Sequence, residues 1–315
     1  MHSVLSHGGE LTPERLAADA RAAGLDFLAT TEHNTAAGHA AWAELGGGNG
    51  DSDTDDSGLL VLFGQEVVTG TGHWLALGLE PGQLIDGGYG VRDAVVDRQL
   101  AAVHRVGGLC VAAHPHAPYP SGTFMYPYEG FDVVEVWNGP WSSDLPWQAD
   151  NEAALAEWGR NLAADVHQGR WRPAIGNSDT HLAGQMGVAH TVVAAAELTA
   201  ASILDGIRAG RSWIAGSAQV WLDFSAAAGP RRAGIGERLE TAGGPAVIHA
   251  GVHGVPGGTI SFHTERGVAH RATLPSGGSD VVQWQTGAAE SGFVRVEVRH
   301  TDRQMAALSN PITLI

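Results

Sequence analysis

The sequence predicts an α/β protein: a parallel (β/α) barrel, or a closely related doubly wound sheet, followed by a small antiparallel β domain. From residue 1 to about residue 215, apolar strand-like runs alternate with segments of helical periodicity. After Gly216, short alternating strands are separated by Gly and Pro turns, with no helical pattern between them. We therefore expect two domains, residues 1–215 and residues 216–315, of which the second is a β-sandwich.

The elements predicted within residues 1–215 follow one another as strand, loop and helix. Met1 to Val4 has the pattern of a strand end, and the first helix begins with Thr12 as N-cap and Pro13 at its first position. Gly24 ends that helix. The other predicted helices cover residues 36–45, 91–106, 148–168 and 198–209. The predicted strands cover residues 25–31, 59–63, 73–78, 109–113, 131–136, 172–176 and 190–195.

The elements predicted within residues 216–315 are all strands, because apolar and polar residues alternate with a period of two. These strands cover residues 220–224, 246–250, 259–263, 281–284 and 293–298. Four scattered histidines of this half are interpreted as structural or surface residues: His249, His253, His263 and His270.

The composition argues against several classes of partner. The 315 residues carry a net charge of -16, and all 18 basic residues are arginines. An acidic chain without a basic run is poorly suited to bind a nucleic-acid backbone or an anionic membrane. No apolar run approaches membrane-spanning length and no signal peptide is visible, which predicts a cytoplasmic protein. The single cysteine, Cys110, follows an apolar run, so we expect an inert buried thiol.

Potential metal ligands follow the predicted strands. Asp179 and His181 come after the strand that ends at Gly176, and their i, i+2 spacing would point both side chains to one face. The carboxyl ends of parallel strands meet at one rim, so ligands after successive strands would meet there too. The candidates are His2, His7, His33, Glu66, His73, His114, Asp179 and His181.

Each candidate alone has an ordinary explanation, since Asn177-Ser178-Asp179 suits a turn and a histidine can be a satisfied core residue. Eight such residues on one rim are harder to explain by packing, because burying imidazoles and carboxylates without cations is costly. Imidazoles and carboxylates without a thiolate suit zinc, manganese or iron. Two or three divalent ions sharing a carboxylate would activate a bridging water, which predicts hydrolysis.

The ordered motifs resemble those of the PHP (polymerase and histidinol phosphatase) metal-dependent phosphoesterases, and in particular the CehA/McbA-like branch. The motifs are Met1-His2-Ser3, His7-Gly8-Gly9, Thr31-Glu32-His33-Asn34, Gly64-Gln65-Glu66, Gly72-His73-Trp74-Leu75, Ala113-His114-Pro115 and Asn177-Ser178-Asp179-Thr180-His181. The resemblance implies a distorted (β/α)7 PHP-type barrel with a two- or three-metal cluster. It implies that Glu66 bridges two ions, with His2 and Asp179 on the first and His73 and His114 on the second. The resemblance assigns the third ion to His7, His33 and His181.

The sequence departs from the family pattern at its start. The family motif opens His-x-His, whereas Met1 occupies the middle position here, so the first histidine would precede the chain. His7 stands where this branch usually has Asp. Either the natural reading frame starts upstream or the ligand is lost in a pseudo-enzyme, and in both cases we expect the first ion to be the weakest bound.

The residues near the expected mouth of the barrel are aromatic or neutral. Packing would explain their presence as well as substrate contact would. They are His116, Tyr119, Trp137, Asn138, Trp141 and His190. A phosphoesterase that acts on a small-molecule phosphoester through a metal-bridged hydroxide is the leading hypothesis, with Glu66, Asp179 and His181 as catalytic residues. A metal-dependent ester, carbamate or amide hydrolase of the CehA type is the second. An inactive PHP-like binding protein is the third.

Overall fold

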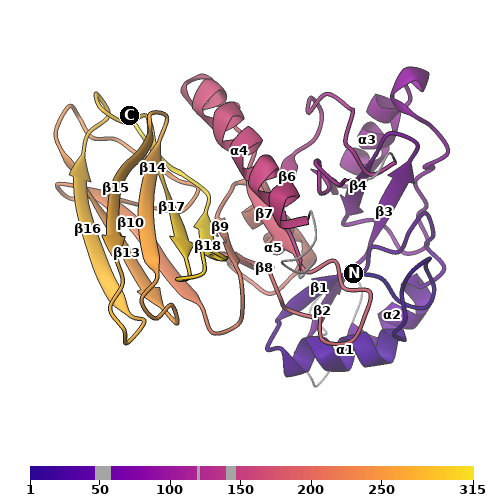
Figure 1. Cartoon of the computed structure of the whole chain (residues 1–315). Helices are drawn as coiled ribbons and strands as arrows, with labels where there is room; N and C mark the ends of the chain where they lie inside the picture. Colours follow the sequence, from indigo (N-terminus) through magenta and orange to yellow (C-terminus); the bar gives the residue numbers. More distant parts are fainter. Residues whose placement is uncertain (47–57, 119–120, 140–146) are drawn as a thin grey trace. The chain divides into compact units, whose positions relative to one another are not determined.

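A computed structural model describes residues 1–46, 58–118, 121–139 and 147–315 (Figure 1). Two residues predicted to contact substrate, Tyr119 and Trp141, lie outside these ranges. The internal contacts divide the chain into two compact units, each built from several stretches. Unit 1 comprises Met1–Leu155, Gly176–Val188 and Ala195–Arg208, and unit 2 comprises Ala156–Ile175, Ala189–Ala194 and Ala209–Ile315. The division into two domains at residue 215 stays a prediction.

The fold is mixed α/β and rich in strands. Its helices are α1 (Pro13–Ala22), α2 (His39–Gly46), α3 (Val96–Arg105), α4 (Trp147–Asp165) and α5 (Ala200–Arg208), with 3-10 turns η1 (Val91–Asp93) and η2 (Val166–Gln168). Thr12 caps α1 as predicted, because its side chain accepts a hydrogen bond from the Arg15 amide at 3.3 Å. The helix predicted over residues 91–106 is interrupted, since Ala94 has a left-handed backbone with φ of 52°.

The strands of the first half form two sheets. β1 (Phe27–Ala29) pairs in parallel with β2 (Leu60–Leu62). The second sheet has the order β3 (Gly64–Thr69), β4 (Gly72–Leu77), β5 (Leu109–Ala112), β6 (Val133–Asn138) and β7 (Ala174–Asn177). This sheet is mixed, because the short turn between β3 and β4 makes them an antiparallel hairpin, whereas β5 and β6 are parallel. The described strands do not form a closed barrel.

Backbone hydrogen bonds join the ends of these strands around the first residues of the chain. Thr30 donates to the Leu62 carbonyl at 3.0 Å, so the chain after β1 continues beside β2. Thr31 donates to the Met1 carbonyl at 3.3 Å, and the His2 amide donates to the Thr180 carbonyl at 2.8 Å. Met1 and His2 therefore lie between the end of β1 and the segment that follows β7.

Antiparallel strands dominate the second unit. One sheet has the order β11 (Arg231–Gly234), β10 (Trp221–Ala228), β13 (Ala246–His253) and β16 (Asp280–Thr286). The other contains β12 (Arg238–Leu239), β19 (Ile312–Leu314), β17 (Phe293–Arg299), β18 (Met305–Ser309), β9 (Ser212–Ala215) and β8 (His190–Val193), with β14 (Thr259–Thr264) on β17 and β15 (Gly267–Thr273) on β14. Buried residues of both sheets, such as Phe224 and Val296, share one apolar core. None of the helices in the described ranges is long and apolar enough to cross a membrane.

Candidate metal centre

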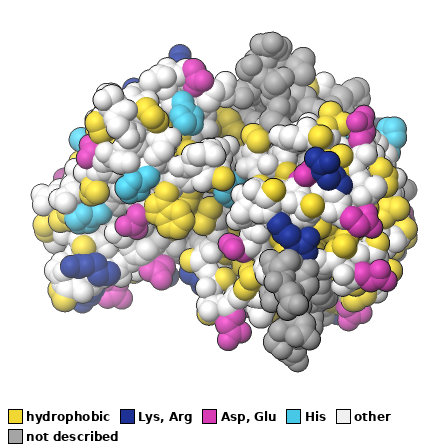
Figure 2. All heavy atoms as spheres, turned by 90° about the horizontal axis from the view of Figure 1, so that it is seen from below, with side chains coloured by type: hydrophobic (Ala, Val, Ile, Leu, Met, Phe, Trp, Pro, Cys, Tyr) yellow, Lys and Arg dark blue, Asp and Glu magenta, His cyan; other side chains and the backbone are white. Residues whose placement is uncertain are grey.

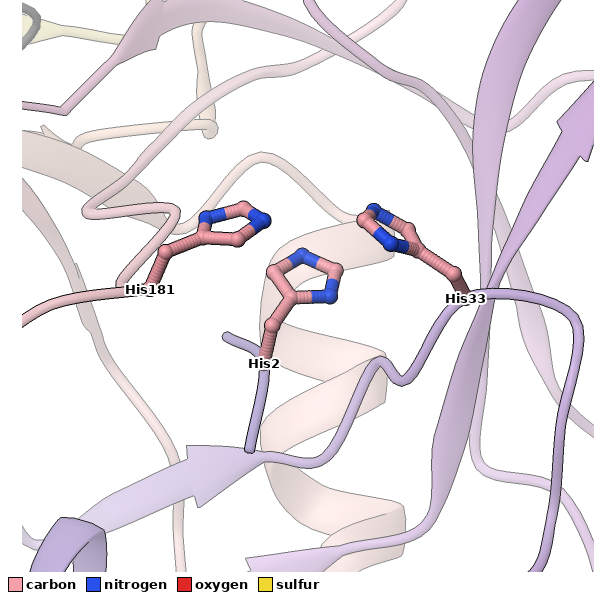
Figure 3. Close-up of side chains that lie close together, drawn as sticks. All are labelled: His2, His33 and His181. Atoms are coloured by element: carbon pink, nitrogen blue, oxygen red, sulfur yellow. The ribbon is translucent and has the colours of Figure 1, made fainter. Parts of the chain in front are cut away.

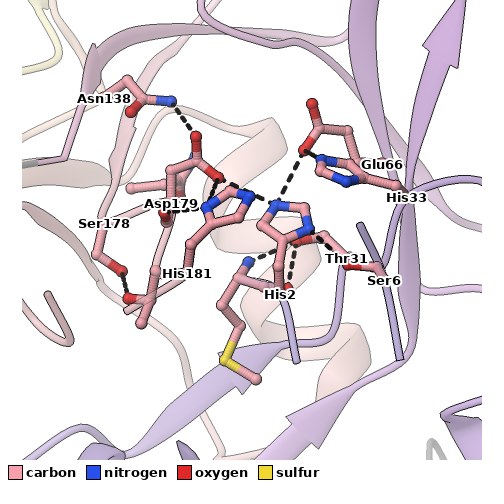
Figure 4. Close-up of polar contacts among 12 residues, drawn as sticks. His2, Ser6, Thr31, His33, Glu66, Asn138, Ser178, Asp179 and His181 are labelled. Carbon is pink, nitrogen blue, oxygen red and sulfur yellow. Dashed lines mark hydrogen bonds and ion pairs between the residues drawn. The ribbon is translucent and has the colours of Figure 1, made fainter. Parts of the chain in front are cut away.

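Histidine and carboxylate side chains from five separate stretches converge within unit 1 (Figures 3 and 4). Seven of the eight predicted ligands take part, in three overlapping groups whose possible donor atoms lie within 4.8 Å of one another. The groups are His2, His33 and His181; His2, Glu66 and Asp179; and Glu66, His73 and His114.

Glu66 on β3 belongs to two of the three groups. Its Oε2 lies 3.1 Å from His2 Nε2 and 3.5 Å from His33 Nε2. Its other oxygen, Oε1, lies 2.8 Å from His73 Nδ1 and 3.3 Å from His114 Nε2. Only 3% of Glu66 is exposed. One buried carboxylate thus presents each oxygen to a different set of imidazoles, as a ligand that bridges two cations must.

His2 is fixed although it is the second residue of the chain. The amide and the hydroxyl of the neighbouring Ser3 donate to the two oxygens of Glu32, at 3.0 and 2.5 Å. His2 Nε2 is 3.0 Å from Asp179 Oδ1 and 3.1 Å from Glu66 Oε2, yet it makes no hydrogen bond of acceptable geometry with either. A buried imidazole nitrogen between two carboxylate oxygens, with no hydrogen bond of its own, fits a bound cation.

The rings of His33 and His181 flank the ring of His2, with centroid separations of 4.1 and 4.2 Å (Figure 3). His33 Nδ1 is 2.9 Å from the His7 carbonyl oxygen, and His181 Nδ1 is 2.9 Å from the Asp179 carbonyl oxygen. A carbonyl only accepts, so both Nδ1 atoms carry the proton and both Nε2 atoms keep a lone pair that suits a metal.

His7 takes part through its backbone. Its carbonyl orients His33, whereas its side chain is exposed and belongs to none of the donor groups found among the described residues. Its role as a ligand of a third ion stays a prediction.

The buried charges of the centre perturb one another. Burial favours the neutral carboxyl of Glu66, but the close imidazoles of His114, His2, His33 and His73 hold its pKa well below the usual range. Burial likewise opposes the charged form of His114, yet Glu66 raises the pKa of this imidazole to about 9. In the absence of metal, protons on the imidazoles thus compensate the carboxylates. A metal ion would replace them, because bound imidazole must be deprotonated.

Two ligands sit on strained backbone and are held by a frame of polar side chains. His114 and Asp179 have left-handed φ angles of 23° and 44°, which non-glycine residues rarely adopt. Glu135 on β6 accepts hydrogen bonds from the His114 amide at 2.7 Å and from Asn177 Nδ2 at 2.8 Å. Asn138 Nδ2 donates to Asp179 Oδ2 at 3.2 Å (Figure 4). This frame, formed by Glu135, Asn138 and Asn177, therefore orients His114 and Asp179, one ligand on each side of Glu66.

Glu135 is not among the residues predicted from the sequence, although the sequence carries a signal for it. A carboxylate in the otherwise apolar run Val133–Val136 is costly to bury without partners, and the residue is only 2% exposed. Burial raises its pKa. Asn138 uses its amide nitrogen to orient Asp179, while its buried Oδ1 has no hydrogen-bond partner among the described residues. Its contact with substrate stays a prediction.

The other residues predicted to contact substrate are not part of these donor groups. His116 forms an isolated β-bridge with Thr123, Trp137 is buried on β6, and His190 begins β8 in unit 2. Their contacts with substrate stay predictions.

The fold and the centre together define a mixed α/β protein with histidine–carboxylate clusters that could hold metal. A family model described as PHP-associated matches residues 159–212, a stretch that contains Asp179 and His181. This match supports an association of the chain with the PHP family. No protein of known, curated function matches the sequence.

Proposed function

We propose that this chain is a metal-dependent hydrolase of the PHP type, in the CehA/McbA-like branch, that acts on a small-molecule phosphoester. The observation that carries this proposal is the position of Glu66, with one carboxylate oxygen on each of two ligand groups. We also propose that the strand ends around Met1 and His2 belong to a distorted (β/α)7 barrel, and that the strands of unit 2 form a β-sandwich.

The residues divide between the ions as follows in this proposal. Glu66 would hold a first ion together with His2 and Asp179, and a second ion together with His73 and His114. His33 and His181 serve a third, to which the family resemblance adds His7. The donor set suits zinc, manganese or iron, and such ions, when bound, lower the pKa of water and polarise a substrate oxygen.

The protein's own side chains hold protons in place and orient the ligand residues. Burial lowers the pKa of His181, so its ring is neutral near neutral pH, with the proton held on Nδ1 by the Asp179 carbonyl. Asn138 and Glu135 fix Asp179 and His114 and so preorganise the ligand groups for charge that develops during hydrolysis.

The test is metal content measured beside turnover. The purified chain, incubated with zinc, manganese or iron(II), is expected to retain two or three ions and to release phosphate from sugar or nucleotide phosphates, with inhibition by free phosphate. A chain that takes up no metal would end the proposal.

A second candidate is an ester, carbamate or amide hydrolase. It is favoured by the absence of lysine from the sequence and by the neutral character of Asn138 beside Asp179. This activity predicts turnover of aryl esters or carbamates without inhibition by phosphate. A metal-loaded chain that binds such compounds and turns over none of them would instead be a binding protein.

A further inference from the structure

A second cluster of donor side chains lies at the opposite ends of the strands. His104 on α3, Cys110 on β5 and Asp132 just before β6 offer a nitrogen, a sulfur and an oxygen atom within 4.8 Å of one another. The cluster is at the amino ends of β5 and β6, whereas His114 and Asn138 are at their carboxyl ends. It is therefore separate from the metal centre described above.

The carboxylate of this cluster is held in place by the backbone. Asp132 Oδ2 accepts a hydrogen bond from the Cys110 amide at 2.8 Å, and the Asp132 amide donates to the Cys110 carbonyl at 2.9 Å. The same oxygen lies 2.8 Å from His104 Nε2. The backbone that fixes the carboxylate thus also carries the thiol, so two of the three donors are preorganised.

The thiol is only weakly engaged, and the imidazole can adjust its position. The thiol of Cys110 has only a weak acceptor, the Leu100 carbonyl, at 3.9 Å from Sγ. The side chain of His104 is 38% exposed and can move by the fraction of an ångström that coordination requires.

A hollow of about 540 Å³ adjoins the cluster and gives access to it. Its lining residues are His104, Gly107, Gly108, Asp132, Ala201, Leu204, Asp205 and Arg208. Arg208 pairs with Asp205 at 2.8 Å and donates to the Gly107 and Gly108 carbonyls. The guanidinium thus pairs with Asp205, while the imidazole of His104 is the side-chain partner of Asp132.

We infer that His104, Cys110 and Asp132 form a binding site for one zinc-class ion, with a water molecule from the hollow as fourth ligand. One thiolate, one imidazole and one carboxylate are donors that zinc accepts in tetrahedral geometry. The thiolate makes this site softer than the histidine–carboxylate centre, so the two sites differ in the metals they prefer. This inference does not rest on the proposed hydrolase function. Ion binding must release the thiol proton of Cys110. Burial opposes this release because it raises the pKa of the thiol.

The experiment uses cobalt(II) as the probe, because Cys110 is the only cysteine of the sequence. Any thiolate-to-cobalt charge-transfer band in the near ultraviolet must then come from this site. Titration of the full chain is expected to give a band whose plateau height corresponds to one thiolate-bound cobalt per chain. His104→Gln keeps the thiol and should weaken cobalt binding, read from that band, at least about tenfold.

Asp205→Asn is the matched control, because Asp205 lines the same hollow but offers no donor to the cluster. It should leave the titration unchanged. Glu66→Ala, which acts only on the other centre, should leave the plateau height of the band unchanged. Circular dichroism confirms that each variant is folded. The inference is overturned if the folded wild-type chain shows no charge-transfer band at saturating cobalt, or if the band titrates identically in His104→Gln.

Discussion

At the scale of single residues, Glu135 is the group whose role the structure defines most closely outside the ligands. Its carboxylate accepts hydrogen bonds from the His114 amide at 2.7 Å and from Asn177 Nδ2 at 2.8 Å. Removing Glu135 would take away a charged acceptor from both donors next to a strained ligand.

Glu135→Ala is therefore expected to lower metal affinity about 10- to 100-fold and to destabilise the fold by about 1–3 kcal/mol. Glu135→Gln keeps one acceptor oxygen and should be milder on both measures. Metal affinity by competition with a chelator, and unfolding by urea, provide the readouts. Glu129→Ala, at an exposed position, is the control. Unchanged metal affinity in Glu135→Ala would show that the frame does not position the ligands.

At the scale of elements, the turn that follows β6 decides where Asp179 lies. Gly139 has φ of 23°, and its amide donates to the Asn177 carbonyl at 2.6 Å. A Cβ atom at this position would lie 2.2 Å from the Ser178 carbonyl oxygen. Since backbone cannot swing aside as a side chain can, a larger residue must displace the segment that leads to Asp179.

Gly139→Ala is accordingly expected to reduce metal binding and any hydrolysis by at least about tenfold. Gly24→Ala is the matched control, because Gly24 also has a left-handed φ, of 73°, but an added Cβ there meets nothing within 4 Å. Gly24→Ala should lower the free energy of unfolding only by the backbone strain, about 1–2 kcal/mol, and should leave metal binding intact. Equal metal affinity in the two variants would contradict the role given to the turn.

In unit 2, His263 on β14 makes stability depend on pH. Burial and then the charge of Arg295 lower its pKa to about 4, from the ordinary value of 6.5. Between these two values the unfolded chain binds the proton and the folded chain does not, so stability is complete above about pH 6.5 and falls as the pH approaches 4.

The loss attributable to His263 is expected to reach at most about 3 kcal/mol. His263→Gln should remove this part of the dependence, which urea unfolding at pH 7 and at pH 4.5 measures. The same slope in wild type and variant would assign the pH dependence to other groups.

Sequence periodicity and residue chemistry predicted the helices and strands and the convergence of most of the candidate side chains. They failed where contacts between residues distant in the sequence decide the structure. Ligands placed after successive strands converge because strand ends meet at one edge, and this is why His33, Glu66, His114 and Asp179 could be grouped from the sequence. Short strands such as β12, and the break at Ala94 before α3, depend on tertiary contacts that no local pattern encodes. The contribution of His7 through its carbonyl could not be predicted either, because every residue carries that group.

At the scale of the whole molecule, the chain is acidic, and its small-molecule substrate stays a proposal. The chain carries a net charge of -16 without lysine. Among the described side chains on the face shown in Figure 2, arginines (dark blue) lie in separate spots among acidic residues (magenta) and do not form a basic patch. Such a face offers little attraction to a polyanion.

The buried carboxylates of the centre require cationic charge, which comes from protonated imidazoles or from metal. The proposed function requires metal. The most direct measurement is metal content per chain in wild type and in Glu66→Ala, after incubation with zinc or manganese and removal of free ions. Because Glu66 serves two ligand groups, its loss should remove two ions at once, while the helical circular dichroism signal stays largely intact. Wild-type chain with no bound metal, or Glu66→Ala with the full wild-type complement, would contradict the account.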